Sequence, residues 1–170
     1  MNQTMKPIKI LVIVSIYIAL GLVVSPFLHM DLGFAKVFPV QSLLNVCIGV
    51  MFGISYNLMG SFALSTLRIL LGVGTIMAYP GSLFGAYLSA LAYKKSRSLW
   101  LAALGECIGT GIIGSLLAYL IAAYVLQTKV GAMAFVIPFM LSSLVGAILA
   151  QFLLRLLRGC KLDYIFSSKG

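Results

Sequence analysis

The chain is built from apolar runs that are long enough to cross a lipid bilayer. Of its 170 residues, 62% are hydrophobic and only 9% are charged, whereas a typical soluble domain carries about 25% charged residues. Such a chain has too few polar side chains to cover a water-facing surface, so its solvent must be lipid. The sequence therefore predicts an all-α integral membrane protein that forms a single transmembrane domain over residues 1–170.

Six apolar runs predict six transmembrane helices, because a helix needs about 20 residues to cross the hydrocarbon core. The predicted helices span residues 10–25, 40–53, 56–73, 80–93, 99–126 and 132–157. Only the short turn GISYN separates the second run from the third, so a single re-entrant element is an alternative there. The first run follows basic residues as a signal peptide does, but Pro26 stands where cleavage would be expected, which favours a retained span.

The basic residues determine the predicted orientation. With both termini in the cytoplasm, the inner side holds Lys6, Lys9, Lys94, Lys95, Arg97, Arg155, Arg158, Lys161 and Lys169. The outer side then holds only Lys36 and Lys129, and Arg68 lies within a span. This bias follows the positive-inside rule, and an odd number of spans would break it. The net charge of +9 therefore reflects membrane topology, and we expect no nucleic-acid partner.

Motifs for catalysis and metal binding are missing from the sequence. It contains no Walker A motif, no GxSxG and no HExxH, and its one histidine and three acidic residues cannot build most hydrolytic sites. Cys47, Cys107 and Cys160 show no CxxC spacing and are expected to pack as small residues. We therefore expect no enzymatic activity, no metal ion and no cofactor.

Polar and small residues at a spacing of four mark the second predicted helix. Gln41, Asn45, Gly49 and Gly53 share one face of it. Amides within a membrane need hydrogen-bond partners. The pattern predicts either a polar patch at the mouth of a site, above a close helix contact, or amide bonds between helices alone.

The predicted outer loops are the expected place for a ligand. PFLHMDLGFAKVFP and GVGTIMAYPG are longer than the inner connections, and long loops on one side of a bundle often form lids or sites. At the start of the fourth predicted helix, Tyr79 and Ser82 lie beside exposed backbone N–H groups that suit a polar or anionic group. His29 in the first loop is either a solvated residue or a lid contact to ligand.

Two ionisable residues, Arg68 and Glu106, fall within predicted spans. Left unpaired in lipid, each would cost several kcal/mol, so each must face protein, water or the other. One interpretation is an ion pair that locks the third and fifth helices together, and the other is contact with a substrate. Glu106 shares a helix face with Thr110 at a spacing of four.

The first predicted helix carries a groove of small residues. Ser15 and Ala19 are four positions apart, and Gly21 and Ser25 extend the series. Small residues let a second helix approach closely. This face is therefore expected to contact either another part of the chain or another subunit.

Three segments, FPVQSLLNVCIGVMFG, RILLGVGTIMAYPGSLFGA and LGECIGTGIIG, resemble the ThiW family of substrate-binding (S) components of energy-coupling-factor (ECF) transporters. The resemblance covers roughly residues 25–123. It implies a six-helix bundle with both termini inside, embedded as a multi-pass protein in the cytoplasmic membrane of a prokaryote. It also implies high-affinity capture, beneath a lid formed by the first outer loop, of hydroxyethylthiazole, the thiazole precursor of thiamine.

The resemblance further implies partner subunits. A transmembrane coupling subunit would pack against the small residues of the first helix, Ser15 and Ala19. Two cytoplasmic ATPase subunits would hydrolyse ATP, which fits the missing Walker A motif. The implied substrate-binding residues are Phe38, Gln41, Asn45, Arg68, Thr75, Tyr79, Ser82, Glu106 and Thr110, with His29 in the lid. Ser42 stands where a histidine is expected.

The implied ligand is small, flat and neutral, so it needs an aromatic face and a few hydrogen-bond partners. Phe38 or Tyr79 is expected to stack on the ring, and amide or hydroxyl side chains are expected to bind its polar atoms. Two alternatives stay open. The ligand could be thiamine or its pyrimidine moiety, although cationic thiamine would favour carboxylates and the outer region offers only Asp31. The chain could also be a membrane assembly protein, without transport, whose glycine faces only pack.

Overall fold

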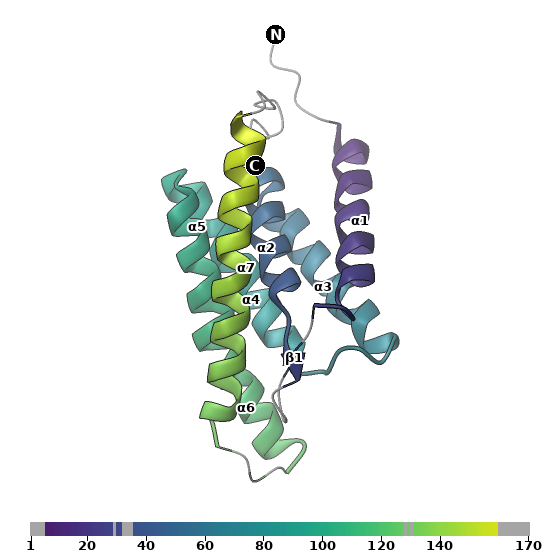
Figure 1. Cartoon of the computed structure of the whole chain (residues 1–170), viewed down its shortest axis with the longest axis vertical. Helices are drawn as coiled ribbons and strands as arrows, with labels where there is room; N and C mark the ends of the chain where they lie inside the picture. The colour runs from purple at the N-terminus through teal and green to yellow at the C-terminus, as the bar shows by residue number, and fades with distance from the viewer. Residues whose placement is uncertain (1–5, 29, 32–35, 128, 130, 160–170) are drawn as a thin grey trace.

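The computed structural model describes residues 6–28, 30–31, 36–127, 129 and 131–159. Its elements, in chain order, are α1 (Pro7–Val24), β1 (Met30–Asp31), β2 (Lys36–Val37), α2 (Pro39–Phe52), α3 (Ile54–Leu70), α4 (Ala78–Ser96), α5 (Leu99–Glu106), the π-helix η1 (Cys107–Gly114), α6 (Ser115–Tyr124) and α7 (Met133–Gly159). Because α5, η1 and α6 follow one another without a break, the described helices form six rods (Figure 1). The strands β1 and β2 form a short antiparallel pair.

The bundle has an apolar exterior, and many polar side chains are buried among the apolar residues of its interior, which is a distribution that a lipid solvent favours. Among the described helices, Pro7–Val24, Leu99–Tyr124 and Met133–Arg158 are long and apolar enough to cross a membrane. Large apolar side chains such as Val23, Ile148 and Phe152 are exposed on the outer faces. Polar side chains such as Asn57 and Ser89 are fully buried. The protein is therefore an all-α membrane bundle, as the sequence predicts.

The two ends of the bundle differ in charge. The start of α1, the α4–α5 junction and the end of α7 lie at the same end (Figure 1), and each carries basic residues. There the Arg155 guanidinium lies 5.2 Å from the centre of the Trp100 ring, and Arg158 Nη2 donates a hydrogen bond of 2.8 Å to the Tyr93 hydroxyl. The strand pair and the α3–α4 connection lie at the opposite end. This arrangement agrees with the positive-inside pattern of the sequence.

Two glycines with positive φ angles shape the turns on either side of α3. Gly53 (φ +85°) separates α2 from α3, so the GISYN segment begins a separate helix. Gly72 (φ +74°) follows the end of α3 and turns the chain back toward α4. A residue with a side chain would be strained at either position.

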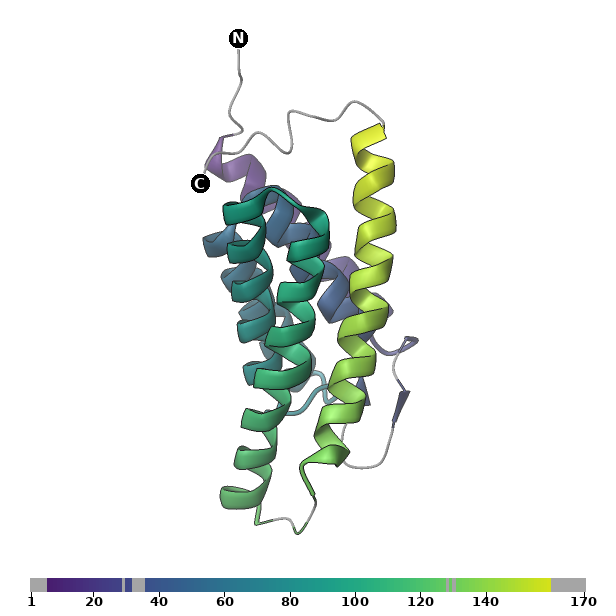
Figure 2. The same ribbon diagram turned by 90° about the vertical axis from the view of Figure 1, so that its left-hand side faces the viewer.

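The most extensive helix contact joins α4 to the rod formed by α5 and η1, which run side by side in Figure 2. Glycines make this contact possible. A methyl group added to Gly105 would lie 2.6 Å from the backbone oxygen of Leu88, and one added to Gly109 would lie 2.5 Å from that of Phe84. These neighbours are backbone atoms that cannot rotate away, so the spacing between the helices depends on the glycines.

The π-helical segment η1 is a feature that the sequence analysis did not predict. It spans Cys107–Gly114 within the predicted helix 99–126. In the sequence, the small residues Gly105 and Gly109 are in register, but Ile113 interrupts the series and the small face shifts to Gly114. A π-helix changes the register of the residues that follow it. The shift in the position of the small residues is therefore the sign of the π-helix in the sequence.

We predict that Gly109→Ala destabilises the protein although alanine favours helices. The added methyl group must push against the α4 backbone, and such overpacking typically costs about 1–3 kcal/mol. Gly131→Ala is the matched control, because a methyl group added there has no neighbour within 4 Å. Thermal unfolding of the purified variants in detergent should show a lower midpoint for Gly109→Ala only. Equal midpoints for both variants would contradict the packing described for α4.

Candidate ligand-binding site

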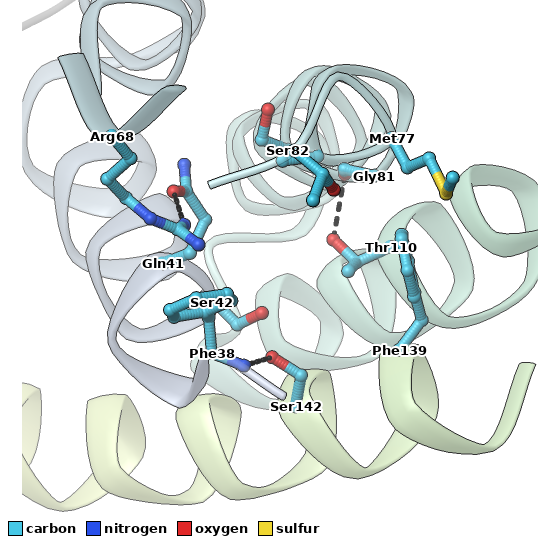
Figure 3. Close-up of a pocket in the computed structure, with 12 residues that line it drawn as sticks. Phe38, Gln41, Ser42, Arg68, Met77, Gly81, Ser82, Thr110, Phe139 and Ser142 are labelled. Atoms are coloured by element: carbon cyan, nitrogen blue, oxygen red, sulfur yellow. Dashed lines mark hydrogen bonds between the residues drawn. The ribbon is translucent and has the colours of Figure 1, made fainter. Parts of the chain in front are cut away.

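A cavity lies at the end of the bundle away from the basic residues, where α2 and α4 begin and α3 ends (Figure 3). The empty space between its walls, including the part that opens to the outside, is about 530 Å³. It is lined by Phe38, Gln41, Ser42, Arg68, Thr75, Met77, Ala78, Gly81, Ser82, Thr110, Phe139 and Ser142. Residues from five of the six rods and from the α3–α4 connection thus converge on one space.

Arg68 is the charged group of this cavity. It lies in the last turn of α3 and is only 1% exposed. Its Nη1 atom donates a hydrogen bond of 2.8 Å to Gln41 Oε1, and its guanidinium carbon lies 3.5 Å from the centre of the Phe38 ring. Such stacking of a cation on an aromatic face is favourable, and more so away from water. Within the described part of the chain, Arg68 forms no ion pair with an acidic side chain.

The loop after α3 folds back over Arg68 and holds it in place. The backbone N–H groups of Val73 and Gly74 both donate to the Arg68 carbonyl oxygen at 3.0 Å. A methyl group on Gly74 would lie 3.1 Å from Arg68 Cβ, which is a tight contact, so glycine favours this close approach of the loop. Together with the positive φ of Gly72, this explains why the arginine is followed by two glycines at a fixed spacing.

Hydrogen bonds link the helices that form the walls of the cavity. The backbone N–H of Phe38 donates to Ser142 Oγ at 3.0 Å, which ties the start of α2 to α7. Ser65 Oγ donates to Ser82 Oγ at 2.9 Å, which ties α3 to α4. Figure 3 shows the bond between Phe38 and Ser142 and the position of Ser82 at the cavity.

Glu106 lies deeper than the cavity and braces three helices. Its side chain is fully buried, and its Oε1 atom accepts hydrogen bonds from Thr110 Oγ1 at 2.8 Å and from Asn45 Nδ2 at 3.3 Å. Asn45 Nδ2 also donates to the Ser82 backbone oxygen at 3.2 Å. Gly85 leaves room for the carboxylate, since a methyl group there would lie 2.7 Å from Glu106 Oε2 and would overlap Thr110 Oγ1.

A second asparagine extends this network toward the opposite end of the bundle. Asn57 Nδ2 donates to the backbone oxygens of Asn45 at 2.8 Å and of Ala86 at 2.7 Å. It thereby joins α3 to both α2 and α4. Glu106 and Arg68 form no ion pair with each other in the described structure, so each is held by a separate set of neutral partners.

The structure brings together most of the residues that were predicted from the sequence to bind a substrate. Six of them line the cavity, namely Phe38, Gln41, Arg68, Thr75, Ser82 and Thr110, and Asn45 and Glu106 lie directly beneath it. Tyr79 does not line it, because its hydroxyl is hydrogen-bonded to Thr66 Oγ1 at 2.9 Å and its ring packs on Phe62 with the centres 5.5 Å apart. His29 lies outside the described residues.

Some lining residues were not nominated from the sequence. Four of them lie within two positions of a predicted residue in the chain, namely Ser42, Met77, Ala78 and Gly81. The other two, Phe139 and Ser142, come from the distant helix α7. Ser142 begins a series of small residues with Gly146 and Ala150 at a spacing of four. This series of small residues could have predicted that this face of α7 packs against the cavity.

Several polar atoms of the cavity walls have no hydrogen-bond partner. They are Arg68 Nε, Arg68 Nη2, Gln41 Nε2 and Ser42 Oγ, and beneath them Glu106 Oε2. All five belong to side chains that are at most 7% exposed. Because buried polar groups are normally hydrogen-bonded, this concentration around one cavity indicates a site for a polar ligand.

Comparison with known proteins gives one family. The model of the family described as thiamine-precursor transporter protein (ThiW) matches residues 11–160. No curated protein and no solved structure matches the chain. The matched range contains all the described cavity residues.

We predict that Glu106→Leu lowers the stability of the protein by about 1–3 kcal/mol, because it leaves Asn45 without its carboxylate acceptor in a buried position. Glu106→Gln should lose less, since its side-chain oxygen can still accept from Thr110 and Asn45. Both losses should exceed that of Gly131→Ala, and chemical denaturation in detergent measures all three. A Glu106→Leu variant as stable as the parent would refute the bracing role.

Proposed function

Since the chain belongs to the ThiW family of thiamine-precursor transporter proteins, we propose that it is the substrate-capture (S) component of an ECF-type importer and that its ligand is hydroxyethylthiazole. ATP would be hydrolysed by partner subunits, because this chain has no Walker A motif. The protein would therefore bind and carry its ligand without changing it chemically.

The cavity is the observation that carries this proposal. Phe38 and Phe139 supply aromatic surface to its walls, and Gln41, Ser42 and Arg68 supply hydrogen-bonding groups. A heteroaromatic ring with a short hydroxyethyl arm presents the matching features, namely a flat face, a ring nitrogen that accepts a hydrogen bond and a hydroxyl group. The ring nitrogen can accept from Arg68 or Gln41, and the hydroxyl can bond to Ser42.

The position of the cavity supports capture from outside. It lies at the end opposite to the basic residues, and the positive-inside rule assigns those residues to the cytoplasm. The strand pair β1–β2 lies at the same end as the cavity and precedes Phe38 in the chain. A ligand arriving from the outer side would therefore reach the cavity without crossing the bundle.

The outer face of α1 supports contact with a coupling subunit. Ser15 and Ala19 are both exposed, whereas the buried residues of α1 are Ile10, Val14 and Gly21. Ser15 and Ala19 therefore face away from the bundle, whereas Gly21 and Ser25 are buried within it. Small residues on a lipid-facing surface permit close approach of a second helix, which is the contact that we propose for the transmembrane coupling subunit.

The two alternatives are less well supported. Thiamine carries a positive charge on its thiazolium ring, and Arg68 would repel it at short range in a low-dielectric site. A purely structural assembly protein has no need for a cavity whose walls contain unpartnered donors, since each such group lowers stability. The arrangement of the walls therefore favours a neutral or negatively charged ligand over thiamine, and a ligand-binding role over a purely structural one.

We predict that the purified protein binds hydroxyethylthiazole with a Kd of about 1 μM or lower, which corresponds to about −8 kcal/mol. Thiamine and the pyrimidine moiety should bind at least about tenfold more weakly. Titration calorimetry in detergent measures all three, with tyrosine fluorescence as a second readout. Tighter binding of thiamine or of the pyrimidine would replace the assigned ligand, and no binding of any of them would favour an assembly role.

A pair of phenylalanine substitutions tests where the ligand binds. Phe38→Leu should weaken binding several-fold because it removes an aromatic wall of the cavity. Phe152→Leu is the matched control, since Phe152 is 66% exposed on the outer face of α7. Equal affinities in the two variants would place the ligand elsewhere.

A further inference from the structure

The buried arginine of the cavity presents one complete edge without partners. Arg68 is only 1% exposed, yet Nε and Nη2 have no hydrogen-bond partner, while Nη1 donates to Gln41 Oε1 at 2.8 Å. Nε and Nη2 belong to the same edge of the planar guanidinium group, so their N–H bonds run nearly parallel. That edge matches the spacing of two oxygen atoms of a carboxylate or a phosphate.

The side chain of Gln41 adds a third donor next to this edge. Because Gln41 Oε1 accepts from Arg68, its amide nitrogen is the free end, and Nε2 has no partner. The side chain of Gln41 is 7% exposed. The neighbouring Ser42 hydroxyl, also without a partner, can donate a hydrogen bond as well. The unpartnered groups on this wall are therefore mainly donors, which call for an acceptor-rich ligand.

The charge of Arg68 leads to the same conclusion. In the described structure its contacts are the neutral amide of Gln41 and the ring of Phe38. Glu106 directs Oε1 to Thr110 and Asn45 and does not pair with it. A buried cation without a counter-charge is unfavourable, and a neutral alcohol would not correct this. An oxyanion would satisfy the free edge, the amide of Gln41 and the charge together.

We propose that Arg68 and Gln41 form a subsite for an oxyanion, so that the preferred ligand is a small aromatic ring bearing a carboxylate or a phosphate monoester. The assignment of the aromatic ring as a thiazole rests on the proposed function. The oxyanion subsite itself rests only on the geometry of the cavity wall. Arg68 is then the specificity-determining residue, and the Phe38 ring stacks on its guanidinium group and so fixes the orientation of that group.

Matched ligand pairs test the subsite in the purified full chain. Hydroxyethylthiazole is compared with its phosphate monoester, and a hydroxymethylthiazole with the corresponding thiazole carboxylate. The oxyanion of each pair should bind at least about tenfold more tightly. If the neutral member binds as tightly or more tightly in both pairs, the subsite is refuted while the proposed function stands.

Substitutions at Arg68 separate charge from geometry. Arg68→Met should reduce the preference for the oxyanion to about onefold, and Arg68→Lys should keep only part of it, because lysine retains the charge but lacks the two-donor edge. Arg155→Met, at the opposite end of the bundle, is the control and should keep the full preference. Should Arg68→Met fail to fold, Gln41→Leu tests the same wall and should lower the preference several-fold. An unchanged preference in the folded variants would overturn the assignment.

Benzoate and benzyl alcohol distinguish failure of the subsite from failure of the thiazole assignment. If no thiazole binds but benzoate raises the unfolding temperature of the parent more than benzyl alcohol does, and Arg68→Lys diminishes that difference, the subsite stands and the proposed ligand is wrong. If thiazoles do not bind and benzoate acts no differently from benzyl alcohol, the subsite is refuted too.

Discussion

A carboxylate buried in a lipid-embedded bundle persists only where donors inside the protein meet it, and the rest of this structure is arranged around that constraint. Glu106 receives donors from η1 through Thr110 and from α2 through Asn45. Asn45 Nδ2 uses its second proton to bond to the α4 backbone at Ser82, and the single hydroxyl proton of Thr110 is shared between Glu106 and the backbone oxygen of Gly81. One acidic group therefore sets the relative positions of three helices, and Gly85 allows α4 to come close enough for it.

The cavity follows from this brace. Because Gly81 and Ser82 are held from below, the first turn of α4 forms a fixed wall. Arg68 stands at the end of α3, and the loop after α3 is folded onto it by two backbone hydrogen bonds. The two ionisable residues of the interior thus have different tasks: Glu106 holds the helices, and Arg68 faces the space that they enclose.

The sequence was sufficient to predict the rods and several residues that line the cavity, because a lipid environment makes both apolar runs and polar residues within them easy to recognise. Apolar runs mark the helices, and polar residues such as Gln41 and Arg68 stand out within them. The π-helix was missed although the shift of the small face from Gly109 to Gly114 is visible in the sequence, because such a shift can also arise in a regular α-helix. Phe139 and Ser142 were missed because ordinary packing residues reveal a cavity only in three dimensions. Tyr79 was predicted to bind the ligand because it lies close in the chain to Ser82. In the structure its side chain points instead toward Thr66.

We propose that the cavity receives its ligand from the outer side of the membrane, and cysteine labelling in intact cells tests this access route most directly. In a chain whose native cysteines are replaced, Thr75→Cys places a thiol on the cavity wall, and Ser96→Cys places one at the basic end. A membrane-impermeant thiol reagent should label Thr75→Cys in intact cells, and hydroxyethylthiazole should protect it. Ser96→Cys should react only after the cells are opened. Labelling of Ser96→Cys alone in intact cells would contradict the account.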